Sequence, residues 1–245
     1  MLCVAKNNNE YVEVTPVKVV KDNCLLNAIK GINSYNTTNY PFELTADMFD
    51  ENSTEIYNHK YYNNKNIIKV EIPNNIKKIN AYAFASCSRL TSVAIGNGVT
   101  SIVDDAFNGC SSLTSITIPN SVKSIGTRAF NGCSSLTSIT IPNSVTSMGG
   151  AVFFGCSSLT SITIPNSVKS IGYNVFRECY RLQIVDFRSA TQVPTVQSDS
   201  FMSVPKTCKF IIPDSLYDSW ITSTNWVSLY NKGYQFIKAS EYTEA

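Results

Sequence analysis

The sequence has few of the residue types on which enzyme and metal sites depend. Its 245 residues include one histidine, His59, and no Cys-x-x-Cys pair, so the usual ligand spacing of a zinc site is missing. No phosphate-binding glycine loop, nucleophile elbow or histidine metal motif occurs. We therefore expect a protein that is not an enzyme, with no catalytic residues, no metal and no cofactor.

Charge and long apolar runs are also scarce. Charged residues make up 16% of the chain and the formal net charge is +2, so no strong field favours nucleic acid or an acidic membrane. No run approaches the roughly 18 apolar residues of a membrane span, so no membrane insertion is expected. The first residues, MLCVAKNNNEYVEV, lack the basic and apolar regions of an export signal. This predicts either a cytosolic protein or a chain numbered without its export signal.

Internal repetition is what the chain has in abundance. The stretch CSSLTSITIPNSV occurs three times unchanged, and cysteine, phenylalanine and leucine each recur with one shared period, the spacing from Cys110 to Cys133. A fixed period of this length is typical of stacked structural repeats, so the copies represent repeated architecture and not repeated chemistry. The three ladders are Cys87, Cys110, Cys133, Cys156 and Cys179; Phe84, Phe107, Phe130, Phe153 and Phe176; and Leu90, Leu113, Leu136, Leu159 and Leu182.

Each repeat combines a short strand with a turn. Ile116 and Ile118 alternate with polar neighbours, as in a half-buried strand, and Pro119 ends it because proline cannot donate to a ladder. The TRAFNGC segment then predicts a short helical or 3₁₀ turn that returns to the next strand. The predicted core positions of this unit are Leu113, Ile116, Ile118, Val122, Ile125, Ala129, Phe130 and Cys133.

The repeat frame extends in weaker form toward both ends. EIYNHKYYNNKNIIKVEIP aligns with SIGTRAFNGCSSLTSITIP without a gap, and a two-residue insertion near Val193 restores the frame at the other end. Gly126, Gly149 and Gly172 follow the turning isoleucine, but Val103 occupies the same position in its repeat, which indicates that glycine is a packing or turn convenience there and not an obligation. Seven strands are expected, beginning near residues 67, 90, 113, 136, 159, 182 and 207.

The pattern C-x-x-L-x-x-I-x-I-P-x-x-V-x-x-I-G-x-x-A-F resembles the BspA-like class of leucine-rich repeats, common in bacterial surface proteins, over roughly residues 51 to 213. The resemblance implies an α/β repeat fold, a solenoid with one short parallel strand and a short helical or 3₁₀ turn per unit. It also implies a non-enzymatic adhesion module, at the cell surface or secreted, that binds an extracellular protein or glycan. The alternative is an intracellular or particle-associated scaffold, which would be cytoplasmic.

The two ends differ from the repeats of the solenoid at residues 51–213. Residues 1–50 are expected to form a cap or a small extra module, and residues 214–245 a cap. In residues 1–50, LCVA and YVEV flank a KNNNE turn, which predicts a hairpin, and CLLNAIKGI predicts a short helix. In residues 214–245, Asp214 could cap a short helix running to about Trp220, and YQFIKA predicts a last strand. Caps stop solenoids from stacking end to end.

The eight cysteines could serve as disulfides, metal ligands or core. Stacked side chains of the cysteine ladder point the same way, which leaves their Cβ atoms farther apart than the roughly 3.8 Å that a disulfide prefers. Asn64 and Val204 take the same slot in the outer repeats, so we predict reduced core thiols. Cys3, Cys24 and Cys208 lie outside the ladder, where a Cys3–Cys24 bridge is the alternative to two buried thiols.

No cluster of acidic or basic residues has the spacing of a known site. His59 and the adjacent carboxylates Asp104 and Asp105 align with repeat positions that predict a solvent-facing turn. A further acidic cluster loosely resembles a calcium loop but lacks the D-x-D-x-D-G spacing, so it predicts a helix start or a solvated loop. This cluster consists of Asp47, Asp50 and Glu51.

The exposed strand face is the best candidate for a binding surface. Its middle is a ladder of short hydroxyls without the aromatic and arginine anchors of most interfaces, so there we favour side chains that simply pair across exposed strands. A flat hydrogen-bonding surface for a protein or glycan is the other interpretation, and the face becomes more varied toward its C-terminal end. The candidate residues are Ser92, Ser115, Thr117, Ser138, Thr140, Ser161, Thr163, Gln183, Ile184, Asp186 and Arg188.

Overall fold

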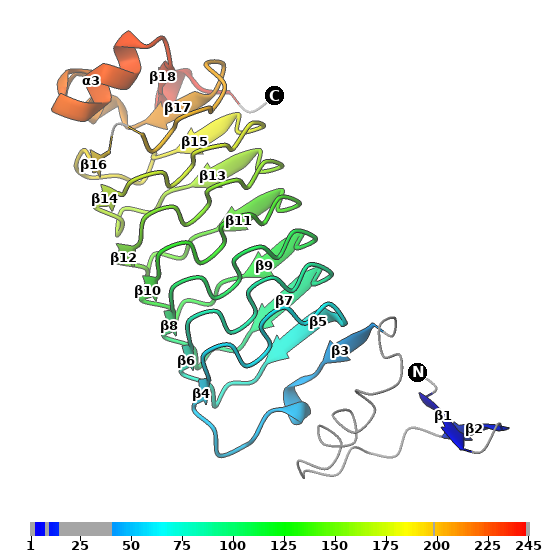
Figure 1. Ribbon diagram of the computed structural model, residues 1–245. Coiled ribbons are helices and arrows are strands. Elements are labelled where there is room, and N and C mark those ends of the chain that lie inside the picture. The colour runs from blue at the N-terminus through cyan, green and yellow to red at the C-terminus, as the bar shows by residue number, and fades with distance from the viewer. Residues whose placement is uncertain (1–2, 8–9, 15–40, 198, 244–245) are drawn as a thin grey trace.

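A computed structural model describes residues 3–7, 10–14, 41–197 and 199–243. The predicted hairpin is present, because β1 (Cys3–Asn7) and β2 (Glu10–Val14) pair antiparallel. The helix predicted at CLLNAIKGI, and Cys24 with it, lie outside the described residues. From β3 onward the chain forms coils stacked along one axis, with β18 at the far end (Figure 1).

One strand from each coil joins a parallel sheet along one face of the stack (Figure 1). All seven predicted strand positions are occupied, and β3 and β18 add a strand at each end. The hydrogen-bonded ladder runs from β3 to β9 and again from β11 to β18. The strands of this first sheet are β3 (Phe42–Leu44), β5 (Ile67–Ile72), β7 (Ser92–Ile95), β9 (Ser115–Thr117), β11 (Ser138–Thr140), β13 (Ser161–Thr163), β15 (Ile184–Asp186), β17 (Lys209–Ile212) and β18 (Gln235–Lys238).

The strand register follows the repeat period. Ser161 pairs with Ile184, which lies one period later in the sequence. Ile184 in turn pairs with Lys209, which lies two positions beyond a full period. Two extra residues therefore lie between β15 and β17, which confirms the insertion near Val193.

Each coil also contributes a second strand of two residues, which the sequence did not predict. Two residues are too few to show an alternation of polar and apolar side chains, so no pattern marks them. These strands form a second set of parallel ladders: β4 (Glu55–Ile56), β6 (Lys78–Ile79), β8 (Ser101–Ile102), β10 (Ser124–Ile125) and β12 (Ser147–Met148), then β14 (Ser170–Ile171) and β16 (Thr195–Val196).

The return segment, predicted as a short helical or 3₁₀ turn, is a series of hydrogen-bonded turns that do not form a regular helix. The Cys133 N–H donates to the Phe130 carbonyl three residues back at 3.2 Å, but the Phe130 N–H donates to the Val152 carbonyl of the next coil at 3.0 Å. Left-handed backbone at Arg128 (φ 55°) and Gly132 (φ 69°) breaks any helix. Alternate backbone donors thus bond within one coil and to the next, which ties the coils together.

Left-handed residues recur at two positions of each repeat, and one of these series contains no glycine. A non-glycine residue in this conformation costs about 1–2 kcal/mol, so the bonds between coils must hold the backbone there. Gly126 and Gly149, by contrast, are not left-handed. A Cβ at Gly126 would lie 2.5 Å from the Asp104 backbone nitrogen, so this glycine is required by close packing, which corrects its interpretation as a convenience. The glycine-free series is His59, Tyr82, Asp105, Arg128, Ala151 and Asn174.

A column of repeated side chains forms the core. Seven aromatic rings, one per coil from Tyr61 to Phe201, stack with neighbouring centroids 5.0 to 5.8 Å apart. Such pairs contribute about 0.5–1.5 kcal/mol each beyond the burial of their area. All eight predicted core positions of the central unit are buried, as predicted.

The cysteine ladder is buried and free of disulfides, as predicted, and so is Cys208. Each ladder thiol donates a hydrogen bond to an aromatic residue's carbonyl in the preceding coil: the Cys110 Sγ lies 3.2 Å from the Phe84 carbonyl oxygen. Burial raises the pKa of the Cys87 thiol from its usual 9.0 to about 12. The thiols therefore stay protonated at neutral pH, so each can donate its S–H hydrogen to the carbonyl of the preceding coil.

The C-terminal end is closed by η3 (Asp214–Leu216), α2 (Tyr217–Thr222) and α3 (Thr224–Asn231), followed by β18 and η4 (Ala239–Glu241). The predicted helix and last strand are confirmed. Asp214 does not cap the helix with its side chain, because its carboxylate accepts hydrogen bonds from the N–H and hydroxyl of Ser240. Trp220 and Trp226 are buried against the last repeat.

Candidate functional site

The residues that could have carried acid–base or metal chemistry are not assembled into a site. His59 is exposed and its ring stacks on Tyr82, with centroids 4.8 Å apart. Asp47, Asp50 and Glu51 are exposed around η2 (Ala46–Met48), which confirms a solvated loop. Within the described part of the chain, no group of three or more His, Cys, Asp or Glu side chains could hold a metal ion.

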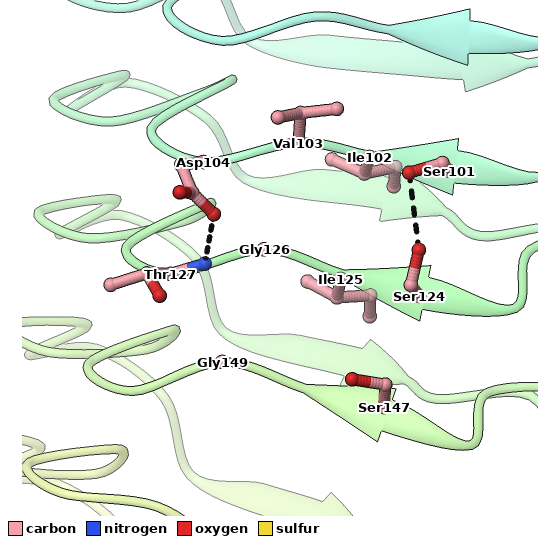
Figure 2. A pocket seen from close by; sticks show the side chains of 10 residues that line it. All are labelled: Ser101, Ile102, Val103, Asp104, Ser124, Ile125, Gly126, Thr127, Ser147 and Gly149. Atoms are coloured by element: carbon pink, nitrogen blue, oxygen red, sulfur yellow. Dashed lines mark hydrogen bonds between the residues drawn. The ribbon is translucent and has the colours of Figure 1, made fainter.

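The adjacent carboxylates Asp104 and Asp105 have different surroundings, and the prediction that both are solvated is wrong for Asp105. That residue is only 1% exposed, and its carboxylate accepts hydrogen bonds from Arg128 at 2.9 and 3.0 Å and from Asn108 at 2.7 Å. Asp104 is exposed and accepts from the Thr127 N–H at 2.7 Å (Figure 2). Both carboxylates join consecutive coils and do not form an acid–base pair.

A hollow of about 310 Å³ lies over the second sheet, where β8, β10 and β12 run side by side (Figure 2). Three serines line it, and the hydroxyls of Ser101 and Ser124 are 3.1 Å apart. Gly126 and Gly149 form part of its floor. Because Ser124 and Thr127 already bond the neighbouring coil, the hollow offers few unsatisfied groups, and we assign no ligand to it.

The predicted strand face lies on the first sheet, with its hydroxyl side chains on the side away from the core. Ser115, Thr117, Ser138 and Thr140 are exposed, and they flank buried isoleucines on β9 and β11. Over these two central strands the face carries neither charge nor aromatic rings. A role of this middle region in binding stays a prediction.

At its C-terminal end the same face is hollowed into a groove of about 750 Å³. Six predicted candidates line it together, while five further lining residues were not predicted to belong to a site: Ile162, Thr207, Lys209, Tyr242 and Thr243. We call this feature the C-terminal groove. It is lined by Ser161, Ile162, Thr163, Gln183, Ile184, Asp186, Arg188, Thr207, Lys209, Tyr242 and Thr243.

An ion pair and an aromatic ring organise the C-terminal groove. The Asp186 carboxylate accepts a hydrogen bond from the Arg188 backbone N–H at 2.9 Å, and it lies 2.7 Å from the Arg188 guanidinium. The Tyr242 ring lies near two cations, because the Arg188 Cζ and the Lys209 Nζ are each 5.9 Å from its centroid. A cation over an aromatic face is attracted to it, so the three side chains hold one another in place.

Sequence reasoning missed Lys209 and Tyr242 for different reasons. Lys209 begins β17 in register with Ile184, so the predicted repeat frame already placed it on the exposed face, but it was not included among the candidates. Tyr242 follows the last strand and reaches the groove only because the chain passes back beside β17 and β15 (Figure 1). No pattern in the sequence marks that reversal.

Several solved structures share this fold. The T. pallidum leucine-rich repeat protein TpLRR is 25% identical, with a TM-score of 0.63 over 69% of this chain and 80% of that one. A leucine-rich repeat protein from Bacteroides ovatus ATCC 8483 is 25% identical, with a TM-score of 0.57 over 71% and 52%. The pneumococcal vaccine antigen PcpA is 24% identical, with a TM-score of 0.62 over 78% and 45%. This chain spans about half the length of the last two proteins.

Sequence comparison gives the family. Among the curated proteins none matches. In the described residues, no helix has the length and apolar character needed to span a bilayer. The model of the BspA type leucine rich repeat region matches in six copies, over residues 25–133, 54–183 and 100–220. Because these matches cover most of the sequence, the chain belongs to the BspA-type leucine-rich repeat family.

Proposed function

We propose that this chain is a non-enzymatic binding module that recognises an extracellular protein or glycan, as part of a cell-surface or secreted adhesin. The observation that carries the proposal is the C-terminal groove, where the strand face, which carries only short hydroxyls over β9 and β11, acquires an ion pair, a second cation and an aromatic ring. Tyrosine and arginine are enriched among the residues that dominate binding energy at interfaces.

The construction of the solenoid supports this role, because it holds the face rigid before any ligand arrives. Backbone bonds between coils and the stacked aromatic column leave little freedom to lose on binding. A preformed surface avoids much of the ordering cost of association. Many weak contacts along such a surface can then add up to useful affinity.

Membership of the BspA-type family supports the extracellular part of the proposal. One structural neighbour, PcpA, is described as a vaccine antigen, a term that fits a protein accessible to antibodies. For the present chain the location is our inference.

Two measurements test the proposal. An antibody to the repeats should label intact source cells as strongly as permeabilised cells. The purified chain should also bind immobilised extracellular matrix or glycans through the first sheet, so Thr163→Arg on that face should weaken binding. Thr146→Arg, which changes an exposed threonine next to β12 of the second sheet, is the matched control and should have no effect. Labelling only after permeabilisation would overturn the proposal in favour of an intracellular scaffold.

A further inference from the structure

We infer that the C-terminal groove binds an acidic saccharide, one that carries a monoanionic substituent such as a carboxylate or a sulfate ester. The inference rests on the proposed function and names the ligand class for one part of the binding face. Three features of the groove carry it: the hydroxyl-rich lining, the single aromatic wall and an uncompensated positive charge.

The lining of the groove suits a ligand with many hydroxyl groups. Besides Tyr242, four of its side chains end in hydroxyls and one in an amide, and each of these groups can both donate and accept. Its volume of about 750 Å³ lies within the range of sites for small ligands. The hydroxyl and amide side chains are those of Ser161, Thr163, Thr207, Thr243 and Gln183.

The aromatic wall favours a sugar over the side chains of a protein. Tyr242 is the one ring among the lining residues and is partly exposed, so its face can pack against the C–H side of a pyranose. Protein partners usually insert apolar or aromatic anchors into desolvated pockets. The C-terminal groove offers little for such an anchor, because its apolar lining is limited to Ile162 and the half-buried Ile184.

The charge balance favours an anion. Asp186 is neutralised by Arg188, with 2.7 Å between the carboxylate and the guanidinium. The ammonium group of Lys209, on the neighbouring strand β17, lies 5.9 Å from the centroid of the Tyr242 ring, and no carboxylate of the described residues lies within ion-pair distance of it. Among the described residues, the groove therefore keeps one positive charge without a paired carboxylate beside the ring, where a single anionic substituent on a stacked sugar would meet it.

Titration with defined tetrasaccharides tests the inference. The probes are a hyaluronan tetrasaccharide, which carries carboxylates, its carboxyl-reduced neutral form, and a keratan sulfate tetrasaccharide, which carries sulfate esters only. We expect at least one acidic probe to bind at least threefold more tightly than the neutral form in NMR titrations of the whole chain. The acidic probe that binds more tightly identifies the anionic group.

Three variants locate the binding. Lys209→Gln should remove the preference for the acidic probe, a loss of about three- to fivefold, as for an exposed charge pair. Tyr242→Ala should weaken all probes. Lys123→Gln, the same change at an exposed lysine beside the second sheet, should leave every affinity unchanged. Circular dichroism and the thermal midpoint show whether each variant is folded, and the Lys209 result stands even if Tyr242→Ala proves unstable.

Several outcomes would overturn the inference. Equal affinities for the acidic and neutral probes, an unchanged preference in Lys209→Gln, or tighter binding of an acetylated tetraglutamate peptide than of any tetrasaccharide would each do so. If these occur while antibody still labels intact cells and the chain still binds matrix, only the ligand class is wrong. If labelling and matrix binding also fail, the proposed function is wrong as well.

Discussion

Arg128 and Asp105 occupy the same repeat position in consecutive coils, and their side chains form an ion pair that links the two coils. The Arg128 Nε lies 2.9 Å from the Asp105 Oδ1, and both residues have left-handed backbone, with φ near 55°. The hydrogen bond to Asp105, and then its charge, raise the pKa of the Arg128 guanidinium. Tyr82 and Ala151 take this position in the coils on either side. Because neither can form an ion pair, this link is specific to the coils of Asp105 and Arg128.

Replacing Arg128 by leucine should destabilise the fold. The change leaves the Asp105 carboxylate buried with Asn108 as its remaining side-chain partner, at a cost of about 1–2 kcal/mol. This is less than for a fully buried pair, because the Arg128 side chain is 49% exposed. Urea unfolding at pH 7 measures the loss. Arg181→Leu changes an exposed arginine and should cost less than about 0.5 kcal/mol, and equal losses would contradict the prediction.

Removing one ring from the aromatic column should be costly. Phe130 is fully buried, and its ring stacks on Phe107 at 5.6 Å and on Phe153 at 5.8 Å. Phe130→Ala should reduce the free energy of unfolding by about 3–5 kcal/mol, because it leaves a cavity between two coils. Phe154→Ala, at a partly exposed ring, should cost much less. If Phe130→Ala lowered the free energy of unfolding only slightly, the neighbouring side chains would have to repack and fill the cavity, which would contradict the prediction.

The buried thiols should make the free energy of unfolding fall as the pH rises into the alkaline range. Burial raises the pKa of the Cys156 thiol from 9.0 to about 12. The unfolded chain releases this proton near pH 9 and the folded chain does not, so the thiol's contribution is complete below pH 9 and is lost as pH rises toward 12. The slope is about 1.4 kcal/mol per pH unit for each thiol.

Cys156→Ala isolates that contribution. The variant should be less stable than the parent at pH 7. The difference in the free energy of unfolding should shrink by about 2 kcal/mol between pH 7 and pH 10.5, because only the parent has a Cys156 thiol whose stabilising contribution is lost. Urea unfolding of both proteins at pH 7, 9 and 10.5 gives the comparison. A difference that stays constant across this range would show that the folded-state thiol titrates normally.

The number of repeats should be adjustable in whole periods. Deletion of residues 134–156 joins Cys133 to Ser157, which restores the local sequence of the Cys156 junction and should give a folded, shorter solenoid that still unfolds cooperatively. Deletion of residues 134–145, about half a period, places strand residues at turn positions and should abolish cooperative unfolding. Circular dichroism and urea unfolding distinguish the two. A misfolded whole-period deletion would mean that the nearly identical units are not interchangeable.

Periodicity made the repeat architecture predictable from sequence. A core position in a solenoid meets the same position one period away, so the recurrence of Phe130 and Cys133 directly indicates which side chains stack. The strand face could be predicted for the same reason, because alternation around Ile116 and Ile139 separates inner from outer side chains. The two-residue insertion near Val193 was visible as a shift in this frame.

The features that periodicity does not encode depended on the tertiary structure. Asp105 aligns with an exposed arginine yet is buried, because its environment is set by Arg128 in the next coil and not by its own position in the repeat. Lys209 and Tyr242 meet only because the chain reverses after β18 and lies beside the last strands. The sequence by itself determined the stacked coils and their buried columns, since those contacts recur once in every period of the repeat. The tertiary structure alone decided the C-terminal groove, because its contacts join segments that share no period.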